Sequence, residues 1–397
     1  MSERPLVLTG LDDLMVHQTV AGVEQPQSTD RNWTEKGYLV AYDTTGEVMV
    51  AVGVGKYSNR NVFDGFAGVA IPGWQYNVRA SRELRPDIDS TSVGPIHWES
   101  IDPPRGNRIR LDENEFGIAF DIEFESPYPP VAETGGRTRI RGVTINDTIR
   151  FFQLGRARGW VTVEGKRYEI TPEQSFAYKD RSWGVRGMTG APASWIVRNT
   201  EMDVTREAGM YLGDREPRPN MSGMFCVDRG SETICATFAE SASGTMLATS
   251  GAAGAGGFVV TPDEQGIAAR PQMVTDIEMD WTFHEGTRRA RGLEATVTVE
   301  DGSKRELAAE GIGLTYYFRG GGYFGFRNWY QGKHFGKDLV VDGEKLDLSD
   351  KAVLDELYGC EEIAARYTVD GVESFGVLEP FAIGELPKYG ITDEHLG

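Results

Sequence analysis

Residues 176–187 read FAYKDRSWGVRG, and they place charged residues around Trp183 and Gly184, between two stretches that otherwise alternate like β-strands. Strands are depleted in Asp and Gly, so this stretch predicts the lip of a ligand pocket. Asp180 beside Arg186 suggests a carboxylate that accepts a substrate proton while the guanidinium holds a developing oxyanion. Tyr178 is a third catalytic candidate, and Trp183 a substrate-binding wall. The alternative is an ion pair that braces a strand bend, with Tyr178 filling the sheet.

Glu379, in FGVLEPF, is the fourth catalytic candidate. A carboxyl among apolar side chains has its charged form disfavoured, so Glu379 is a candidate acid. Pairing with an arginine at a strand end is its alternative. His97 in GPIHWES and His334 in NWYQGKHFG also lie among aromatic residues, and both are candidates for substrate binding or for structural roles.

Aromatic residues are dense in LTYYFRGGGYFGFRNWYQGKHFG, at 314–336. Aromatic side chains bury large areas, so most of these belong to a core. If a cavity is present, part of the set lines it for a ring or prenyl ligand, and Tyr316, Tyr323 and Trp329 are the predicted substrate-binding members.

Motifs for cofactors and metals are missing from the sequence. There is no Gly-rich phosphate loop after a strand, no HExxH and no GxSxG, and the five histidines show no ligand spacing. We therefore expect no cofactor and no metal, and acid–base chemistry in a dry pocket. The three cysteines form no CxxC pair, and we expect them to be reduced thiols.

The elements that position these residues read mainly as antiparallel strands. Residues 117–125 and 273–283 alternate with a period of two. Glu164-Gly165, Asp301-Gly302, Asp342-Gly343 and Asp370-Gly371 are predicted hairpin turns. One helix is predicted at about 350–358, with Ser349 as its cap.

Many antiparallel strands hide their edges by closing into barrels or sandwiches. A chain of 397 residues exceeds one ordinary domain. We predict an all-β fold of two tandem antiparallel barrels with one short helix, divided into domains at 1–170 and 171–397.

The net charge of −19 repels nucleic acid, which is an unlikely partner for this chain. No apolar run approaches a membrane span, and the start MSERPLVLTGLDDL lacks the basic and apolar parts of a signal peptide. We expect a cytoplasmic protein whose partner is a hydrophobic small molecule; whether it forms a homodimer stays open.

The run DRSWGVR, followed by GKHFGKDLVVDGEKLDLSD and VDGVESFGVLEPF, resembles the hydroxyneurosporene synthase (carotenoid 1,2-hydratase) superfamily. It is most similar to a bacterial group with an R-D/E-x-SWG-x-R signature, which Asp180, Ser182, Trp183, Gly184 and Arg186 match. The resemblance implies two tandem lipocalin-like barrels and cofactor-free chemistry on bulky hydrophobic molecules, as in carotenoid hydratases and fungal cyclases. The hydratases' His-containing catalytic pattern is absent at this site.

Together these features predict a cofactor-independent lyase or hydro-lyase for a hydrophobic ring-bearing compound, such as an aromatic dimer, a steroid or a terpenoid. A carrier without activity and a cyclase or isomerase are the alternatives. Fold alone cannot choose among them.

Overall fold

The computed structural model describes residues 26, 28–133, 136–140, 143–186, 221–246, 255–262, 271–323, 325–382 and 385–392. Within these residues the chain is built mainly of antiparallel strands, with one short α-helix, α2 (Lys351–Leu357). The predicted all-β class is therefore confirmed. None of the described helices is both long and apolar enough to cross a membrane.

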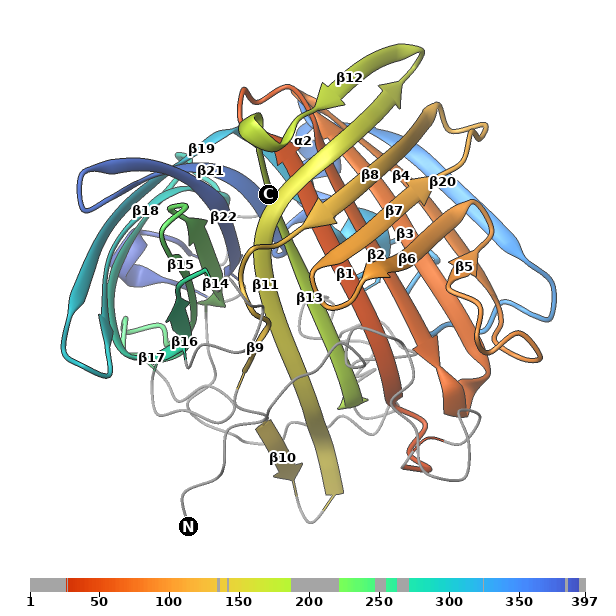
Figure 1. Cartoon of the computed structure of the whole chain (residues 1–397), viewed down its shortest axis with the longest axis horizontal. Coiled ribbons are helices and arrows are strands. Elements are labelled where there is room, and N and C mark those ends of the chain that lie inside the picture. The colour runs from red at the N-terminus through yellow and green to blue at the C-terminus, as the bar shows by residue number, and fades with distance from the viewer. Residues whose placement is uncertain are drawn as a thin grey trace.

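The first sheet contains fourteen strands, and its main path runs β20-β4-β3-β2-β1-β13-β11-β8-β7-β6-β5. Figure 1 shows these strands in red, orange and yellow, with β20 in light blue beside β4. The strands are β1 (Trp33–Asp43), β2 (Met49–Tyr57), β3 (Val62–Ile71), β4 (Trp74–Glu83), β5 (Ser92–Val93), β6 (Ile96–Asp102), β7 (Gly106–Leu111), β8 (Ile118–Glu125), β9 (Val131–Ala132), β10 (Gly136–Ile140), β11 (Val143–Val163), β12 (Lys166–Ile170), β13 (Ser175–Arg186) and β20 (Val340–Asp347).

The second sheet is a closed barrel of eight strands, drawn in green, teal and blue in Figure 1. Its strands, in their order around the barrel, are β14 (Met221–Asp228), β15 (Thr233–Glu240), β16 (Ala255–Val260), β17 (Gln272–Phe283), β18 (Ala290–Val299), β19 (Lys304–Tyr317), β21 (Glu361–Val369) and β22 (Val372–Ala382). Closure pairs the first strand with the last and so removes the exposed edges.

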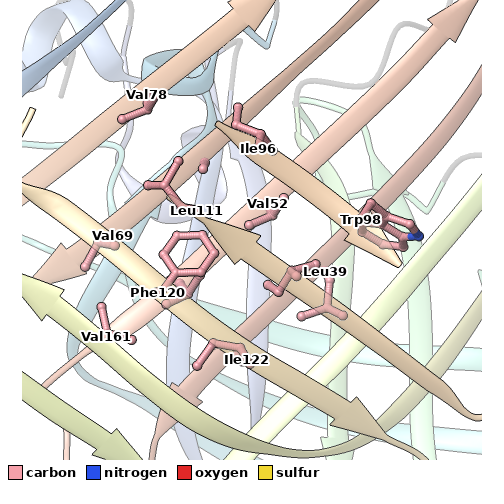
Figure 2. Packing of buried hydrophobic residues seen from close by; sticks show 14 of the residues in the cluster. Leu39, Val52, Val69, Val78, Ile96, Trp98, Leu111, Phe120, Ile122 and Val161 are labelled. Atoms are coloured by element: carbon pink, nitrogen blue, oxygen red, sulfur yellow. The ribbon is translucent and has the colours of Figure 1, made fainter. Parts of the chain in front are cut away.

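Each sheet encloses its own apolar core. In the first sheet, Leu39 and Val52 pack with Trp98, Phe120 and other buried side chains from both ends of the strand order, so the sheet curls on itself (Figure 2). A separate set, including Phe225, Trp281 and Tyr367, fills the closed barrel. Because side chains fill both interiors, the space for a ligand must lie elsewhere.

The outward faces of the two sheets pack against each other through a third apolar cluster. Tyr42, Phe152 and Phe176 of the first sheet meet Cys226 and Val377 of the barrel there. Alternate residues of one strand point to opposite faces, so β13 contributes to the first core through Ala177 and to this contact through Phe176 and Tyr178.

Several local predictions are confirmed. The predicted alternation at 117–125 and 273–283 corresponds to β8 and β17. Glu164-Gly165, Asp301-Gly302 and Asp370-Gly371 join paired strands. Asp342-Gly343 was wrongly predicted as a turn, because it lies inside β20, which pairs with β4.

The helix prediction is confirmed with a different cap. Asp350, not Ser349, accepts the N–H of Ala352 at 2.8 Å, while the Ser349 hydroxyl contacts Asp347. The domain boundary at 170/171 stays a prediction. β13 and β20 both follow it in sequence and both pair within the first sheet.

The expectation of reduced cysteines is wrong for two of the three. Cys226 and Cys235 lie directly opposite each other on β14 and β15 and form a disulfide. Cys360 is a buried free thiol. The bonded cysteines are nine positions apart in the sequence, and the strand pairing brings them together.

Candidate functional site

A cavity of about 380 Å³ lies between the first sheet and the closed barrel. This volume is within the range of small-molecule sites. β1, β2, β3, β11 and β13 provide one wall, and β14, β15, β16 and β22 provide the facing wall. Part of the cavity is covered by Phe318, Gly321, Tyr323, Trp329 and Gln331. We call this space the inter-sheet cavity.

Strand pairing arranges the cavity-facing residues of the first sheet in rows. One row is Arg150, Ser182, Lys36, Gly55 and Asp64, and the next is Phe152, Asp180, Tyr38, Gly53 and Phe66. Tyr178 belongs to the row after that. A strand rises about 3.4 Å per residue, so the rows of Tyr178 and Ser182 are about 13 Å apart.

Apolar side chains line much of the cavity between these polar groups. They are Val54, Phe66, Met224, Phe238, Phe258, Met273, Phe318, Trp329 and Phe381. Glycines keep the floor of the cavity open: a methyl group added at Gly53 would stand 2.3 Å from the Phe66 ring. The lining fits a ligand with an extended apolar body.

Two carboxyls and two phenols meet at one end of the cavity, and we call them the acid cluster. The Tyr178 hydroxyl lies 2.9 Å from Glu362 Oε2 and 3.2 Å from Glu379 Oε2. The Tyr38 hydroxyl lies 3.1 Å from the same Glu362 oxygen. Tyr38, Tyr178 and Glu379 line the cavity, whereas Glu362 is fully buried behind them.

Burial raises the pKa of Glu379 to about 8, and the nearby Asp180 and Glu133 carboxylates add to the rise against the pull of Arg150. Burial, reinforced by Glu379, also raises the pKa of Glu362. A phenol has one hydrogen, so Tyr178 cannot donate to both carboxyls at once. The second contact requires a carboxyl that carries its own proton.

Arg150 lies among acidic groups in the middle of the cavity wall. Its Nε is 3.6 Å from Asp180 Oδ2 and 3.7 Å from Glu133 Oε2. Asp180 Oδ1 is buried, and within the described part of the chain it has no hydrogen-bond partner. Asp180 lines the cavity and its side chain is 20% exposed, so its carboxylate can accept a proton or a hydrogen bond from a ligand.

Arg186 and Lys36 carry positive charge farther along the same face. Arg186 donates to Tyr323 Oη at 3.4 Å and to Ser182 Oγ at 3.2 Å. Lys36 Nζ donates to Gln331 Oε1, and Asp64 Oδ2 accepts the Gly332 N–H at 2.6 Å. Residues 331–332 thus close over this end of the cavity.

Six of the ten predicted site residues line the inter-sheet cavity. They are Tyr178, Asp180, Arg186, Tyr323, Trp329 and Glu379. Tyr178, Asp180 and Arg186 come from the same face of β13, and Glu379 on β22 of the barrel lies within hydrogen-bond distance of Tyr178. The structure thus brings together residues that are some 200 positions apart in sequence. Their functional roles remain predictions.

The other four predicted residues lie elsewhere. Trp183 is an odd-numbered residue of β13 and points to the face opposite Ser182. Tyr316 lies behind the cavity wall, stacked on Phe66 and bonded to Asn77 at 2.9 Å.

Both histidines have polar partners away from the cavity. His97 contacts Ser92 and Asp112, each at 2.8 Å. His334 is 45% exposed and lies 3.4 Å from Glu83. These contacts match the structural alternative given for both residues.

Sequence reasoning missed Lys36, Asp64, Glu133, Arg150 and Glu362. A signal was present for one of them, because Asp64 is the single charge inside the otherwise apolar strand β3. Among the described residues, no group of three or more His, Cys, Asp or Glu side chains is arranged to hold a metal ion.

These features define a β protein with two packed sheets and a polar cavity between them. More particularly, the chain belongs to a family whose description is "Family of unknown function (DUF8625)", and the family model matches residues 8–392. No curated protein matches the sequence. The resemblance to the hydroxyneurosporene synthase superfamily stays a prediction.

Solved structures give distant matches. Kievitone hydratase from Nectria haematococca is 12% identical, with 94% of this chain and 93% of that chain covered, at a TM-score of 0.42. CghA with Sch210972 is 10% identical, with 89% of each chain covered, at a TM-score of 0.42. CghA alone is 10% identical, with coverages of 88% and 87% and a TM-score of 0.39. Similarity at this level says nothing of the reaction.

Proposed function

We propose that the chain is a cofactor-independent lyase or hydro-lyase that acts on a hydrophobic ring-bearing molecule in the inter-sheet cavity. The observation that carries the proposal is the Glu379 carboxyl, which faces the cavity and has a pKa raised to about 8. Such a carboxyl holds its proton at neutral pH and serves as a general acid.

Besides the general acid, an elimination needs a base and a group that stabilises negative charge, and we assign these roles to Asp180 and Arg186. The Asp180 carboxylate, which lines the cavity, takes a proton from a carbon of the substrate, and the electron pair of the broken C–H bond forms the new double bond. Glu379 protonates the leaving hydroxyl on the adjacent carbon, which departs as water. Arg186 stabilises negative charge that develops on a conjugated oxygen. The reverse sequence of steps is a hydration.

The acid cluster gives Glu379 a route to recover its proton. After the reaction Glu379 is anionic, and the Tyr178 hydroxyl lies 3.2 Å away. Tyr178 can pass on its proton while it receives one from Glu362, which is buried behind it. The cycle closes when Asp180 releases the proton that it took from carbon and Glu362 takes one up. Tyr178 and Glu362 are therefore proposed as a proton relay.

The test is to incubate the purified chain with hydroxylated aromatic dimers, sterols and terpenoids in heavy water and to follow product masses. Loss of one water supports the proposal. Glu379→Gln should slow turnover by about 10²–10⁴-fold, the usual contribution of a general acid, and Asp180→Asn should be similarly slow. The exposed Glu373 on the same strand gives the matched control, Glu373→Gln, which should keep full activity.

Three results would contradict the proposal. A compound that stays bound through gel filtration without any change would make the chain a carrier. An isomeric product of unchanged mass would make it an isomerase or cyclase. Full turnover in a folded Glu379→Gln variant would remove the proposed acid.

A further inference from the structure

Lys36 is a cavity-lining charge that has no role in the elimination proposed above. It lies on β1, two strands from Asp64, in the row that runs across Gly55. Its side chain faces the cavity, where Gln331 is the one hydrogen-bond acceptor that the described residues give to Nζ. The rings of Tyr57 and Tyr323 lie 5.7 and 5.5 Å from Nζ.

The surroundings of Lys36 disfavour an ammonium ion. An ammonium has three N–H donors, and a single acceptor leaves two of them facing the cavity. Burial and the Arg186 guanidinium together lower the pKa of Lys36 to about 7, although Asp64 and Asp180 pull the other way. A large fraction of the amine is neutral at physiological pH, and a neutral amine is a nucleophile.

Proton-transfer groups flank this amine. The Tyr57 hydroxyl lies over Gly55, since a methyl group at Gly55 would stand only 2.6 Å from it. Gly55 pairs with Lys36 on one side and with Asp64 on the other. The Tyr57 hydroxyl therefore lies between the Lys36 and Asp64 positions. Burial raises the pKa of Asp64 to about 7, so this carboxyl can give and take a proton near neutral pH.

We propose that Lys36 is a nucleophilic amine that condenses with an aldehyde or ketone carbonyl of a ligand in the inter-sheet cavity. The nitrogen lone pair attacks the carbonyl carbon, and the carbonyl oxygen takes a proton from Asp64 or Tyr57. The carbinolamine then loses its hydroxyl as water, with a second proton delivered from the same groups. The nitrogen gives up its two hydrogens, and a C=N bond replaces the C=O bond.

This assignment goes beyond the proposed elimination and does not need Glu379. It identifies the ligand as a carbonyl compound whose carbonyl end lies by Lys36, while its apolar body extends toward the acid cluster. The row of Lys36 and that of Tyr178 are about 13 Å apart, which suits a ligand of two or more rings.

The experiment traps the imine with a reductant. The full-length chain is incubated at pH 7 with 2-naphthaldehyde and sodium cyanoborohydride, and labelled lysines are located by peptide mass mapping. A lysine with its ordinary pKa is neutral for only about 1 part in 3,000 at this pH, whereas Lys36 is about half neutral. We expect Lys36 to be labelled at least about 100-fold faster than exposed lysines.

Two other buried lysines provide internal controls. Lys56 donates to the Ile88 carbonyl at 2.6 Å, and Lys179 donates to Pro104 and Asn107; neither lines the cavity. Both should remain unlabelled while the chain is folded. Their labelling together with Lys36 would indicate unfolding or unselective reaction and would overturn the assignment.

Variants separate this proposal from the lyase proposal. Lys36→Gln should abolish the fast labelling and keep cooperative unfolding, whereas Glu379→Gln should keep the labelling. A folded wild-type chain with no excess label at Lys36 would refute the proposal. So would tight binding of 2-naphthoate that depends on Lys36 without any trapping of the aldehyde, because that result would define an anion site.

Discussion

Replacing Glu379 by Gln tests the central electrostatic claim without a known substrate. The glutamine keeps the shape and the hydrogen bonding but cannot ionise. In the wild type the folded state binds the Glu379 proton more tightly than the unfolded chain does, because its pKa rises from 4.5 to about 8. Stability from this group is therefore fully present below about pH 4.5 and falls as the pH rises to about 8.

The size of the effect follows from the same two values. At 1.36 kcal/mol per pKa unit the rise corresponds to an upper limit of about 5 kcal/mol. Glu362 also repels the ionised Glu379, and this repulsion is lost in the variant. The measured difference in unfolding free energy therefore includes the stability gained by removing it. We expect the free energy of unfolding of Glu379→Gln, relative to that of the wild type, to rise by about 2–5 kcal/mol between pH 5 and pH 9.

The assay is urea unfolding of the wild type, Glu379→Gln and Glu373→Gln at pH 5, 7 and 9 and constant ionic strength. Glu373 is exposed on the same strand, so its variant should follow the wild type at every pH. If the difference between Glu379→Gln and the wild type stayed flat across this range, Glu379 would ionise normally and the acid assignment would fail.

Three further predictions concern the structure around the cavity. Arg181→Met should cost about 3–5 kcal/mol in urea unfolding, because it removes the buried positive charge that lies 3.6 Å from the buried Glu35 carboxylate, and adding Glu35→Gln should restore part of the loss. Reducing Cys226–Cys235, or replacing both by Ala, should lower stability by about 2–3 kcal/mol for a loop of this length, and equal unfolding curves with and without reductant would contradict the bond. Trp183→Leu should leave cavity ligand affinity within about twofold by calorimetry, and a tenfold loss would place the indole in the site.

The alternation of side chains along β13 shows which part of the site could be predicted from the sequence. Tyr178, Asp180 and Arg186 are even-numbered and line the cavity, while Lys179 and Trp183 are odd-numbered and do not. One strand presents alternate residues to opposite faces, so the split follows once this run is seen to be a strand and not the lip between two strands. The chemistry expected of the motif stays a prediction, and grouping its residues by closeness in sequence included Trp183, which does not line the cavity.

Other parts of the site depend on contacts that no local pattern records. Glu362 is adjacent in sequence to Ile363, which pairs with Leu378 beside Glu379, so the two carboxyls meet only through the β21–β22 register. β20 belongs to the C-terminal half of the sequence but pairs with β4 of the first sheet. Its Asp342-Gly343 dipeptide is typical of a turn and gives no sign of this pairing. Long-range pairing of this kind decides which charges share a cavity.

The position of the cavity follows from how the two sheets are filled. Apolar side chains fill most of each interior, and the charged residues buried inside the first sheet, such as Lys179 and Arg181, have polar partners there. The cavity lies between the outward faces. Where those faces meet, most of the area is apolar. A charged group there loses its hydration unless it faces a cavity or pairs with another polar group. The shifted pKa values of Lys36, Asp64, Glu362 and Glu379 are consequences of that one contact. Four such groups, retained on one contact surface against their desolvation cost, support the proposal of chemistry on a bound molecule.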